Sequence, residues 1–268
     1  MNELVPLWRR AITAEVCWLD EAGEPAALAV TPLLAGSTPC VAVPYARAAE
    51  VASLRRASRV AFAVTDSRSL RPGRPGALWS GSVEVADDTS GDFFATELLR
   101  QELAKYPPSR TLADSPLLCR ENWWWLPRIV VRLTGAAAGP ELPARTNPAR
   151  HALLVRERDA ELAVDVVDVD DLTRRRVPLR RLDGGTVRGD GAPGLLLGYD
   201  YSIPDLERWE PWSARGTVLG EELAVTARAG EPGAELAPLR LLQRIRRQRL
   251  LASRCKQGIL DAERASAG

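Results

Sequence analysis

The residues best suited to contact a flat or charged molecule are concentrated in one short stretch, RENWWWLPRIVVRL (Arg120–Leu133). It contains three consecutive tryptophans, of eight in the chain, ahead of an alternating, strand-like pattern. Tryptophan supplies a large apolar surface for a core and a flat face for a ligand, so both roles are open. If the extended geometry reaches back from the strand, Trp123 and Trp125 face the core, whereas Trp124 and Arg128 face the other side. Trp124 is then the candidate contact for a ring, and Arg128 for an anionic group.

Other side chains with reactive or metal-binding chemistry are sparse. The four cysteines, Cys17, Cys40, Cys119 and Cys255, are far apart without a CxxC pair, and His151 is the single histidine. Such a set makes a poor metal site, and we expect buried free thiols instead. The sequence has no GxSxG, no Walker loop and no combination of His, Cys and Asp that indicates hydrolysis. No protein nucleophile or proton relay is predicted, and the catalytic residues of any reaction stay unknown.

The composition is that of a soluble globular protein. The chain has 268 residues, 46% hydrophobic and 26% charged, which suffices for one large domain or two small ones. Its 36 Lys and Arg nearly balance 35 Asp and Glu, so no whole-molecule field would attract nucleic acid or an anionic membrane. The N-terminal segment lacks a secretory pattern, and no run approaches the roughly 20 apolar residues that span a bilayer. We therefore expect a cytoplasmic protein with no membrane or nucleic-acid partner.

The elements that must position these residues form a small, mainly β unit in the first half. Alternating and β-branched residues predict strands over 14–20, 25–34, 40–45, 59–66, 77–88 and 129–133. In the fifth of these, Trp79, Gly81, Val83 and Val85 share the inward face. A short helix is predicted over 46–58, and a longer one over 89–109 begins at cap-type residues and stops at two prolines.

A segment rich in Pro, Gly and Ala, 134–149, is the best domain boundary in the chain. We predict a first domain over 1–139 and a second over 150–268. The second domain contains β-favouring runs over 151–157, 161–169, 177–182, 194–202, 213–220 and 222–228. Within it, Trp212–Val218 distantly echoes Trp79–Val83, and a degenerate duplication is one explanation.

The chain continues with a segment, 234–265, whose composition predicts a helix. Its apolar side is predicted to consist of Leu239, Leu242, Ile245, Leu250 and Leu251. Seven basic residues and no acid lie between Leu239 and Lys256. The favoured interpretation is a solvated face whose arginine stems pack on the barrel; a site for an acidic partner or nucleic acid is the alternative.

The order of predicted elements from about Ala14 to Leu133 resembles the FMN-binding split barrel of the pyridoxamine 5'-phosphate oxidase-like superfamily. EAGEPAALAVTPLL is similar to that family's turn and first long hairpin strand, and CVAVPYARAAEVASLRRASRVAFAVTD to its strand, helix and following strand. GSVEVADD is similar to its glycine-containing strand. The resemblance implies an α+β, predominantly β fold, with a split barrel in the N-terminal half, a second smaller β-unit and a C-terminal helix. That second unit is itself a candidate for a degenerate split barrel.

In this family the flavin lies in a groove at a dimer interface, with its ring against strand backbone and its phosphate held by basic side chains near the short helix. A phosphate favours charge-assisted donors in a fixed fork. The cofactor-binding residues implied by the resemblance, together with those from the tryptophan stretch, are Thr31, Pro32, Pro44, Tyr45, Arg47, Arg55, Arg56, Trp79, Gly81, Trp124 and Arg128. Val43 occupies a further corresponding strand position.

The sequence departs from this family at Glu50, where the usual relatives have a lysine that helps to hold the phosphate. Ala48 also stands where a serine is common. A poorly solvated carboxylate would repel a phosphate by an energy on the order of a kcal/mol or more. Arg47 lies within one helical turn of Glu50, so it either substitutes for the missing lysine or forms an ion pair with Glu50.

Two functions from different classes follow. The first is a flavin- or deazaflavin-binding oxidoreductase that acts on an unknown small molecule, with FMN supplying the chemistry and the protein the orientation. The alternative is a non-catalytic relative that has lost the phosphate clamp and acts as a ligand-binding or interaction module, with no cofactor. Haem binding, known for some relatives, is disfavoured because His151 lies in the linker and Met1 is the only methionine. The resemblance also implies a homodimer, although an internal duplication could mimic that dimer within one chain.

Overall fold

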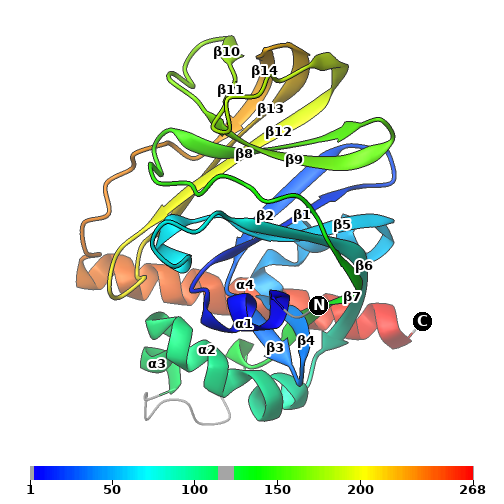
Figure 1. Ribbon diagram of the computed structural model, residues 1–268. Helices are drawn as coiled ribbons and strands as arrows, with labels where there is room; N and C mark the ends of the chain where they lie inside the picture. The colour runs from blue at the N-terminus through cyan, green and yellow to red at the C-terminus, as the bar shows by residue number, and fades with distance from the viewer. Residues whose placement is uncertain (1–2, 114–123, 268) are drawn as a thin grey trace.

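The computed structural model describes residues 3–113 and 124–267 (Figure 1). The predictions for Trp123 and Cys119 lie outside these residues. The chain forms two curled, barrel-like seven-stranded sheets, with short helices around the first and a long helix at the C-terminal end. The predicted α+β, predominantly β fold with a split barrel is confirmed. Within the described ranges, no helix has the length and apolar character needed to cross a membrane.

The N-terminal sheet has the strand order β2-β1-β5-β6-β7-β4-β3, and its neighbouring strands are antiparallel. Its strands are β1 (Ala14–Leu19), β2 (Pro25–Val30), β3 (Leu33–Ala35), β4 (Thr38–Pro44), β5 (Arg59–Val64), β6 (Ala77–Asp88) and β7 (Arg128–Ala138). The single strand predicted over 25–34 is divided in two at Thr31 and Pro32. Proline has no N–H for a strand ladder, which accounts for the break.

Alternation in β5 and β7 sorts side chains as the sequence predicts. Val60, Phe62 and Val64 belong to the main N-terminal core, as do Ile129, Val131 and Leu133 of β7. The opposite face of β5 is also buried, because its small residues pack against the second sheet. Both faces of β5 are thus covered.

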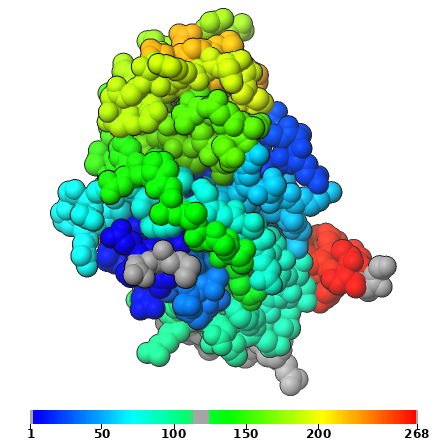
Figure 2. Space-filling view, turned by 45° about the vertical axis from the view of Figure 1, so that its right-hand side comes forward, coloured from blue at the N-terminus to red at the C-terminus, as the bar shows by residue number. Residues whose placement is uncertain are grey.

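The second sheet has the order β10-β14-β13-β12-β8-β9-β11, again with antiparallel neighbours. Its strands are β8 (His151–Arg158), β9 (Glu161–Asp168), β10 (Arg176–Pro178), β11 (Arg180–Arg181), β12 (Gly189–Tyr201), β13 (Trp209–Gly220) and β14 (Glu222–Ala229). It has its own apolar core, centred on Leu154, Leu196 and Trp212. A third cluster, which includes Cys17 and Leu153, joins the two sheets, and Figure 2 shows the second half stacked on the first.

The helical segments differ in detail from the prediction. They are α1 (Leu4–Arg10), η1 (Tyr45–Val51), η2 (Ser53–Arg56), η3 (Ser67–Ser69), η4 (Phe94–Leu98), α2 (Leu99–Lys105), α3 (Pro107–Ala113) and α4 (Leu241–Ala267). The short helix predicted over 46–58 consists of two 3-10 segments. The helix predicted over 89–109 is wrong at its end: Pro107 starts α3, because proline fits the first turn of a helix.

Helix α4 crosses Figure 1 behind α1 and packs against η1. Its predicted apolar side is only partly correct, because Leu242, Ile245 and Leu250 are exposed. The residues that anchor the helix lie later, at Cys255, which is buried, and at Ile259, which packs on the main core. The long helix thus covers part of the first half although it follows the second in the chain.

Candidate functional site

Arg47, one of the residues predicted to hold a cofactor phosphate, is already paired. Its guanidinium donates to both carboxylate oxygens of Glu50, with Nη2 at 2.8 Å and Nε at 3.1 Å. Of the two alternatives that the sequence left open, the structure has the Arg47–Glu50 ion pair. Both side chains remain partly exposed, so the pair lies at the surface rather than in a sealed site.

The other two predicted phosphate-binding arginines also contact carboxylates of the same chain. Arg55 lies 2.7 Å from Asp87, and the Tyr45 hydroxyl donates to the same carboxylate at 3.0 Å. Burial raises the pKa of Tyr45, so this hydroxyl stays a proton donor at neutral pH. Arg56 lies 3.5 Å from Glu21 and is largely exposed. The structure therefore places Tyr45, Arg55 and Asp87 together, in a locally balanced set of charges.

The backbone of α4 lies directly on η1. A Cβ placed on Gly258 would stand 2.7 Å from the carbonyl oxygen of Tyr45, so only glycine permits this approach. Cys255, one turn earlier, is buried beside Ala46, and burial raises the pKa of its thiol. The face of η1 that meets α4 is consequently filled by protein.

Trp124 and Trp125 belong to the apolar cluster beneath α4. They lie in a short 3-10 turn and are 6% and 5% exposed, packed in one cluster with Cys255. The predicted alternation, with Trp124 facing away from Trp125, is wrong, because the extended geometry of β7 does not reach back past Pro127. Burial in this cluster favours a core role for both indole rings.

Arg128 is a core residue rather than a surface cation. It is 1% exposed, its guanidinium lies 4.1 Å over the Phe94 ring, and its Nη2 is 3.4 Å from Glu102. Its Nε has no hydrogen-bond partner among the described residues. Because Arg128 is buried, an anionic group from solvent cannot reach its guanidinium in this arrangement.

The remaining predicted positions lie along the strands of the first half. Thr31 and Pro44 are partly buried, and the carbonyl oxygen of Pro32 accepts a hydrogen bond of 2.6 Å from Lys105. Burial lowers the pKa of Lys105 to about 7. Gly81 lies at a bulge of β6, where a Cβ would stand 2.5 Å from the carbonyl oxygen of Thr134. Its role there is close backbone packing.

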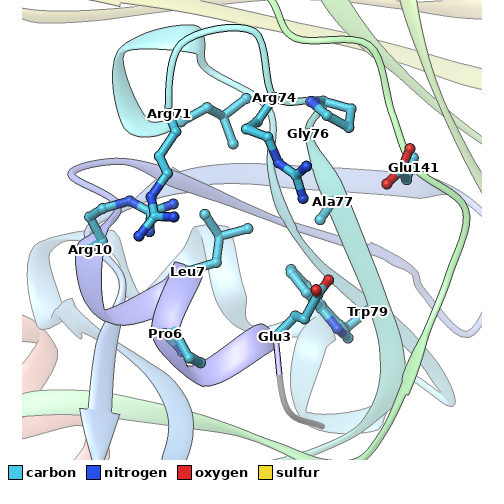
Figure 3. A pocket seen from close by; sticks show the side chains of 12 residues that line it. Glu3, Pro6, Leu7, Arg10, Arg71, Arg74, Gly76, Ala77, Trp79 and Glu141 are labelled. Atoms are coloured by element: carbon cyan, nitrogen blue, oxygen red, sulfur yellow. The ribbon is translucent and has the colours of Figure 1, made fainter.

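Trp79 lies apart from this group, on the wall of a cavity of about 230 Å³ between α1 and the start of β6 (Figure 3). The cavity is lined by Glu3, Pro6, Leu7, Arg10, Leu70, Arg71, Arg74, Pro75, Gly76, Ala77, Trp79 and Glu141. We call it the arginine cavity. The side chains of Arg10, Arg71 and Arg74 form no hydrogen bond or ion pair with any residue in 3–113 or 124–267.

The sequence interpretation missed this cavity. It noted SRSLRPGRPG only as a basic, proline-rich loop between two strands. The signal was present, because Arg71 and Arg74 flank a Pro–Gly turn that keeps both side chains near one another. The sequence does not indicate that Arg10 lines the same cavity, since this depends on how α1 packs against that loop.

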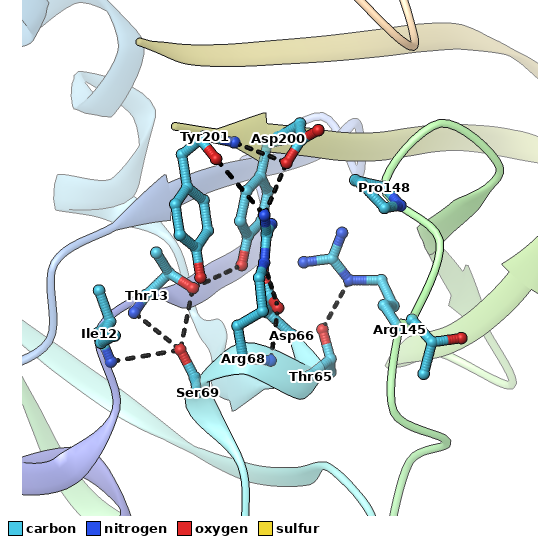
Figure 4. A network of polar contacts seen from close by, with 12 residues as sticks. Ile12, Thr13, Thr65, Asp66, Arg68, Ser69, Arg145, Pro148, Asp200 and Tyr201 are labelled. Atoms are coloured by element: carbon cyan, nitrogen blue, oxygen red, sulfur yellow. Dashed lines mark hydrogen bonds and ion pairs between the residues drawn. The ribbon is translucent and has the colours of Figure 1, made fainter. Parts of the chain in front are cut away.

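A second polar cluster joins the two sheets (Figure 4). Glu15 is fully buried, and its Oε1 accepts hydrogen bonds from Arg145 and Tyr199 at 2.6 Å each and from Thr65 at 2.9 Å. The Arg145 guanidinium lies 4.3 Å over the Tyr199 ring. Because Glu15 and Thr65 come from the first half and Tyr199 from the second, this network orients one sheet on the other.

The described cysteines are buried free thiols, as the sequence analysis expected. Cys17, Cys40 and Cys255 are free and buried, and burial raises the pKa of Cys40 to about 12. Within the described part of the chain, no three His, Cys, Asp or Glu side chains are grouped as metal ligands.

Comparison with known proteins gives likeness to solved structures only. No family model and no curated protein matches the chain. A NimC/NimA family protein from Clostridium acetobutylicum is 9% identical over 51% of this chain and 80% of its own, with a TM-score of 0.34. HutZ, the haem storage protein from Vibrio cholerae, is 9% identical over 53% of this chain and 95% of its own, with a TM-score of 0.35. A haem-binding protein from Mycobacterium smegmatis is 16% identical over 94% of this chain and 96% of its own, with a TM-score of 0.30.

Proposed function

We propose that this chain is a non-catalytic split-barrel protein that binds a small anionic molecule. The observation that carries the proposal is a contrast between two groups of arginines. Arg47, Arg55 and Arg56, which the family resemblance assigns to a flavin phosphate, each contact a carboxylate of the same chain. The three arginines of the arginine cavity contact none within the described ranges.

Electrostatics supports this assignment. A phosphate that approached Arg47 or Arg55 would have to compete with Glu50 or Asp87 for the same donors. Each retained carboxylate would repel it by an energy on the order of a kcal/mol. An anion that entered the arginine cavity would displace no side-chain partner of its three arginines, and these outnumber the two carboxylates, Glu3 and Glu141, that also line it.

The flavin oxidoreductase is the alternative, with FMN or a deazaflavin as cofactor. It is favoured by the exposure of the Arg47–Glu50 and Arg55–Asp87 pairs, because exposed ion pairs contribute only about 0–1 kcal/mol and can exchange partners. This alternative requires space for a flavin ring beside η1, where α4 packs closely.

Assembly is part of the proposal. We propose that the two sheets form within one chain the pairing that the family resemblance implies for a homodimer. Five adjacent strands have the same order in both sheets, which supports this idea. Sedimentation or light scattering that gives the mass of one chain would agree with it, whereas twice that mass would favour the homodimer.

A titration of the purified protein with FMN, FAD and a deazaflavin tests the proposed function. We expect a colourless protein, no flavin retention, and no change in flavin fluorescence that depends on Arg47 or Arg55. A yellow protein whose flavin affinity falls several-fold in Arg47→Ala would contradict the proposal and restore the oxidoreductase. Arg100→Ala, at an exposed arginine on α2, removes one positive charge elsewhere and serves as the control.

A further inference from the structure

The wall of the arginine cavity is partly apolar. Leu7, Leu70 and Ala77 line it together with the Trp79 ring (Figure 3). The Trp79 indole N–H donates to no residue in 3–113 or 124–267, although the ring is only 5% exposed. A planar ligand ring could therefore lie against apolar groups and meet one unused donor.

The charged groups occupy separate sides of the cavity. In Figure 3, Arg10 and Arg71 point toward one another at the left, and Arg74 lies to their right. Glu141 lies on the opposite side, and Glu3 lies beside Trp79. Three positive charges against two negative ones leave the cavity net positive, with its cationic and anionic groups apart.

The two carboxylates are as free as the arginines. Neither Glu3 nor Glu141 forms an ion pair or a side-chain hydrogen bond with a described residue, and both are exposed. A carboxylate accepts hydrogen bonds and cannot donate them. A ligand that fits both sides carries an anionic group at one end and N–H donors at the other.

We infer that the arginine cavity binds a nucleoside monophosphate. The phosphate lies between Arg10, Arg71 and Arg74, and the amino group of the base points to Glu3 or Glu141. This inference rests on the proposed function and names the ligand class of its site. Phosphate is favoured over a single carboxylate because its oxygens accept from several guanidinium forks at once.

The size of the cavity limits the ligand. Its volume of about 230 Å³ is below the roughly 300–1,000 Å³ of pockets that enclose drug-sized molecules. A mononucleotide fits if its ribose faces the open side. A dinucleotide would leave one half outside without protein contacts.

Isothermal titration calorimetry of the full chain with AMP, CMP and UMP tests the inference. We expect AMP and CMP to bind, and Arg71→Ala to weaken both by about tenfold or more. We expect UMP, which lacks the exocyclic amino group, to bind more weakly than CMP. Added NaCl should lower the affinity, since the arginines are exposed.

Controls separate the site from nonspecific charge effects. Arg100→Ala should leave nucleotide affinity unchanged, and Glu141→Gln should reduce the preference for CMP over UMP. Inorganic phosphate should compete with AMP. No binding of any of the three nucleotides, or equal losses in Arg71→Ala and Arg100→Ala, would overturn the inference.

The same measurements distinguish this inference from the proposed function. Absence of nucleotide binding in a protein that also ignores FMN would overturn the nucleotide inference alone. FMN binding that Arg56→Ala weakens and Arg71→Ala leaves unchanged would contradict the proposed function instead, because the flavin would then lie beside η2.

Discussion

The two sheets of this chain share the order of five adjacent strands and differ in what surrounds them. The first has β2-β1-β5-β6-β7 and the second has β9-β8-β12-β13-β14, which are counterparts in chain order. One more strand lies beside the fifth in each sheet, the seven-residue β4 beside β7 and the three-residue β10 beside β14. Across residues 3–113 and 124–267, every helical segment precedes β7 or follows β14. Among these helices, α1 supplies one wall of the arginine cavity.

The counterpart strands β6 and β13 show this difference at one residue type. Trp79 lines the arginine cavity, whereas Trp212 is enclosed in the second core and donates to the carbonyl oxygen of Pro148 at 3.0 Å. The echo between Trp79–Val83 and Trp212–Val218 thus lies on matching strands. In the second sheet the Trp212 indole packs inside the core, whereas in the first the Trp79 indole borders a cavity.

The largest predicted effect comes from the network that joins the sheets. Arg145→Ala would leave Glu15 buried without its cation, and we expect a loss of about 3–5 kcal/mol in the free energy of unfolding. Urea unfolding followed by tryptophan fluorescence measures it. Arg150→Ala removes an arginine that pairs with Asp168 at the surface and should lose much less, because such ion pairs contribute little. Similar losses in both variants would show that the network does not hold the sheets together.

A smaller effect is expected where Trp212 fills the second core. A Cβ on Gly198 would stand 2.2 Å from the Trp212 ring, so Gly198→Ala should lose about 1–3 kcal/mol through overpacking. Adding Trp212→Phe makes room for the methyl group. The double variant should therefore be more stable than the sum of the two single losses predicts. Strict additivity, measured by urea unfolding, would count against the close packing of this pair.

The smallest effect concerns Lys105, a partly buried lysine of the first half. Burial lowers the pKa of Lys105 to about 7, against about 10.4 for the lysine in an unfolded chain. The folded state has then lost a proton that the unfolded state retains between these values, so stability should rise with pH there. We expect the free energy of unfolding to rise by about 1 kcal/mol between pH 6.5 and 9. The rise is limited because two carbonyl oxygens, of Trp8 and Pro32, accept hydrogen bonds from the charged lysine. In Lys105→Met, the free energy of unfolding should change less with pH. The same pH dependence in both proteins would refute the lowered pKa of Lys105.

Sequence reasoning recovers the strands better than the site. Period-two patterns fix which side of β5 and β7 faces the core, because one buried face is enough to specify register. The prolines were harder to interpret, since Pro32 interrupts a strand and Pro107 begins a helix. Local pattern does not distinguish the two outcomes.

The candidate site depends on contacts between residues far apart in the chain. The pairing of Arg47 with Glu50 was foreseeable as one of two alternatives because they are neighbours on one turn. The pairing of Arg55 with Asp87 was not, since it requires the register of β6 against η2. Arg128 resembled a surface cation in the sequence, and its burial follows from η4 and α2 packing over it.

The contact of Gly258 with Tyr45 bears on how the protein is made. The residues of the first sheet emerge from the ribosome before α4 has been synthesised. Domains generally fold in the order in which they emerge. During that interval η1 and the apolar residues around Trp124 lack their final cover. The first half therefore completes its packing only when α4 has been made. A stop codon placed after β14 would leave η1 and the cluster around Trp124 uncovered, although both are made early.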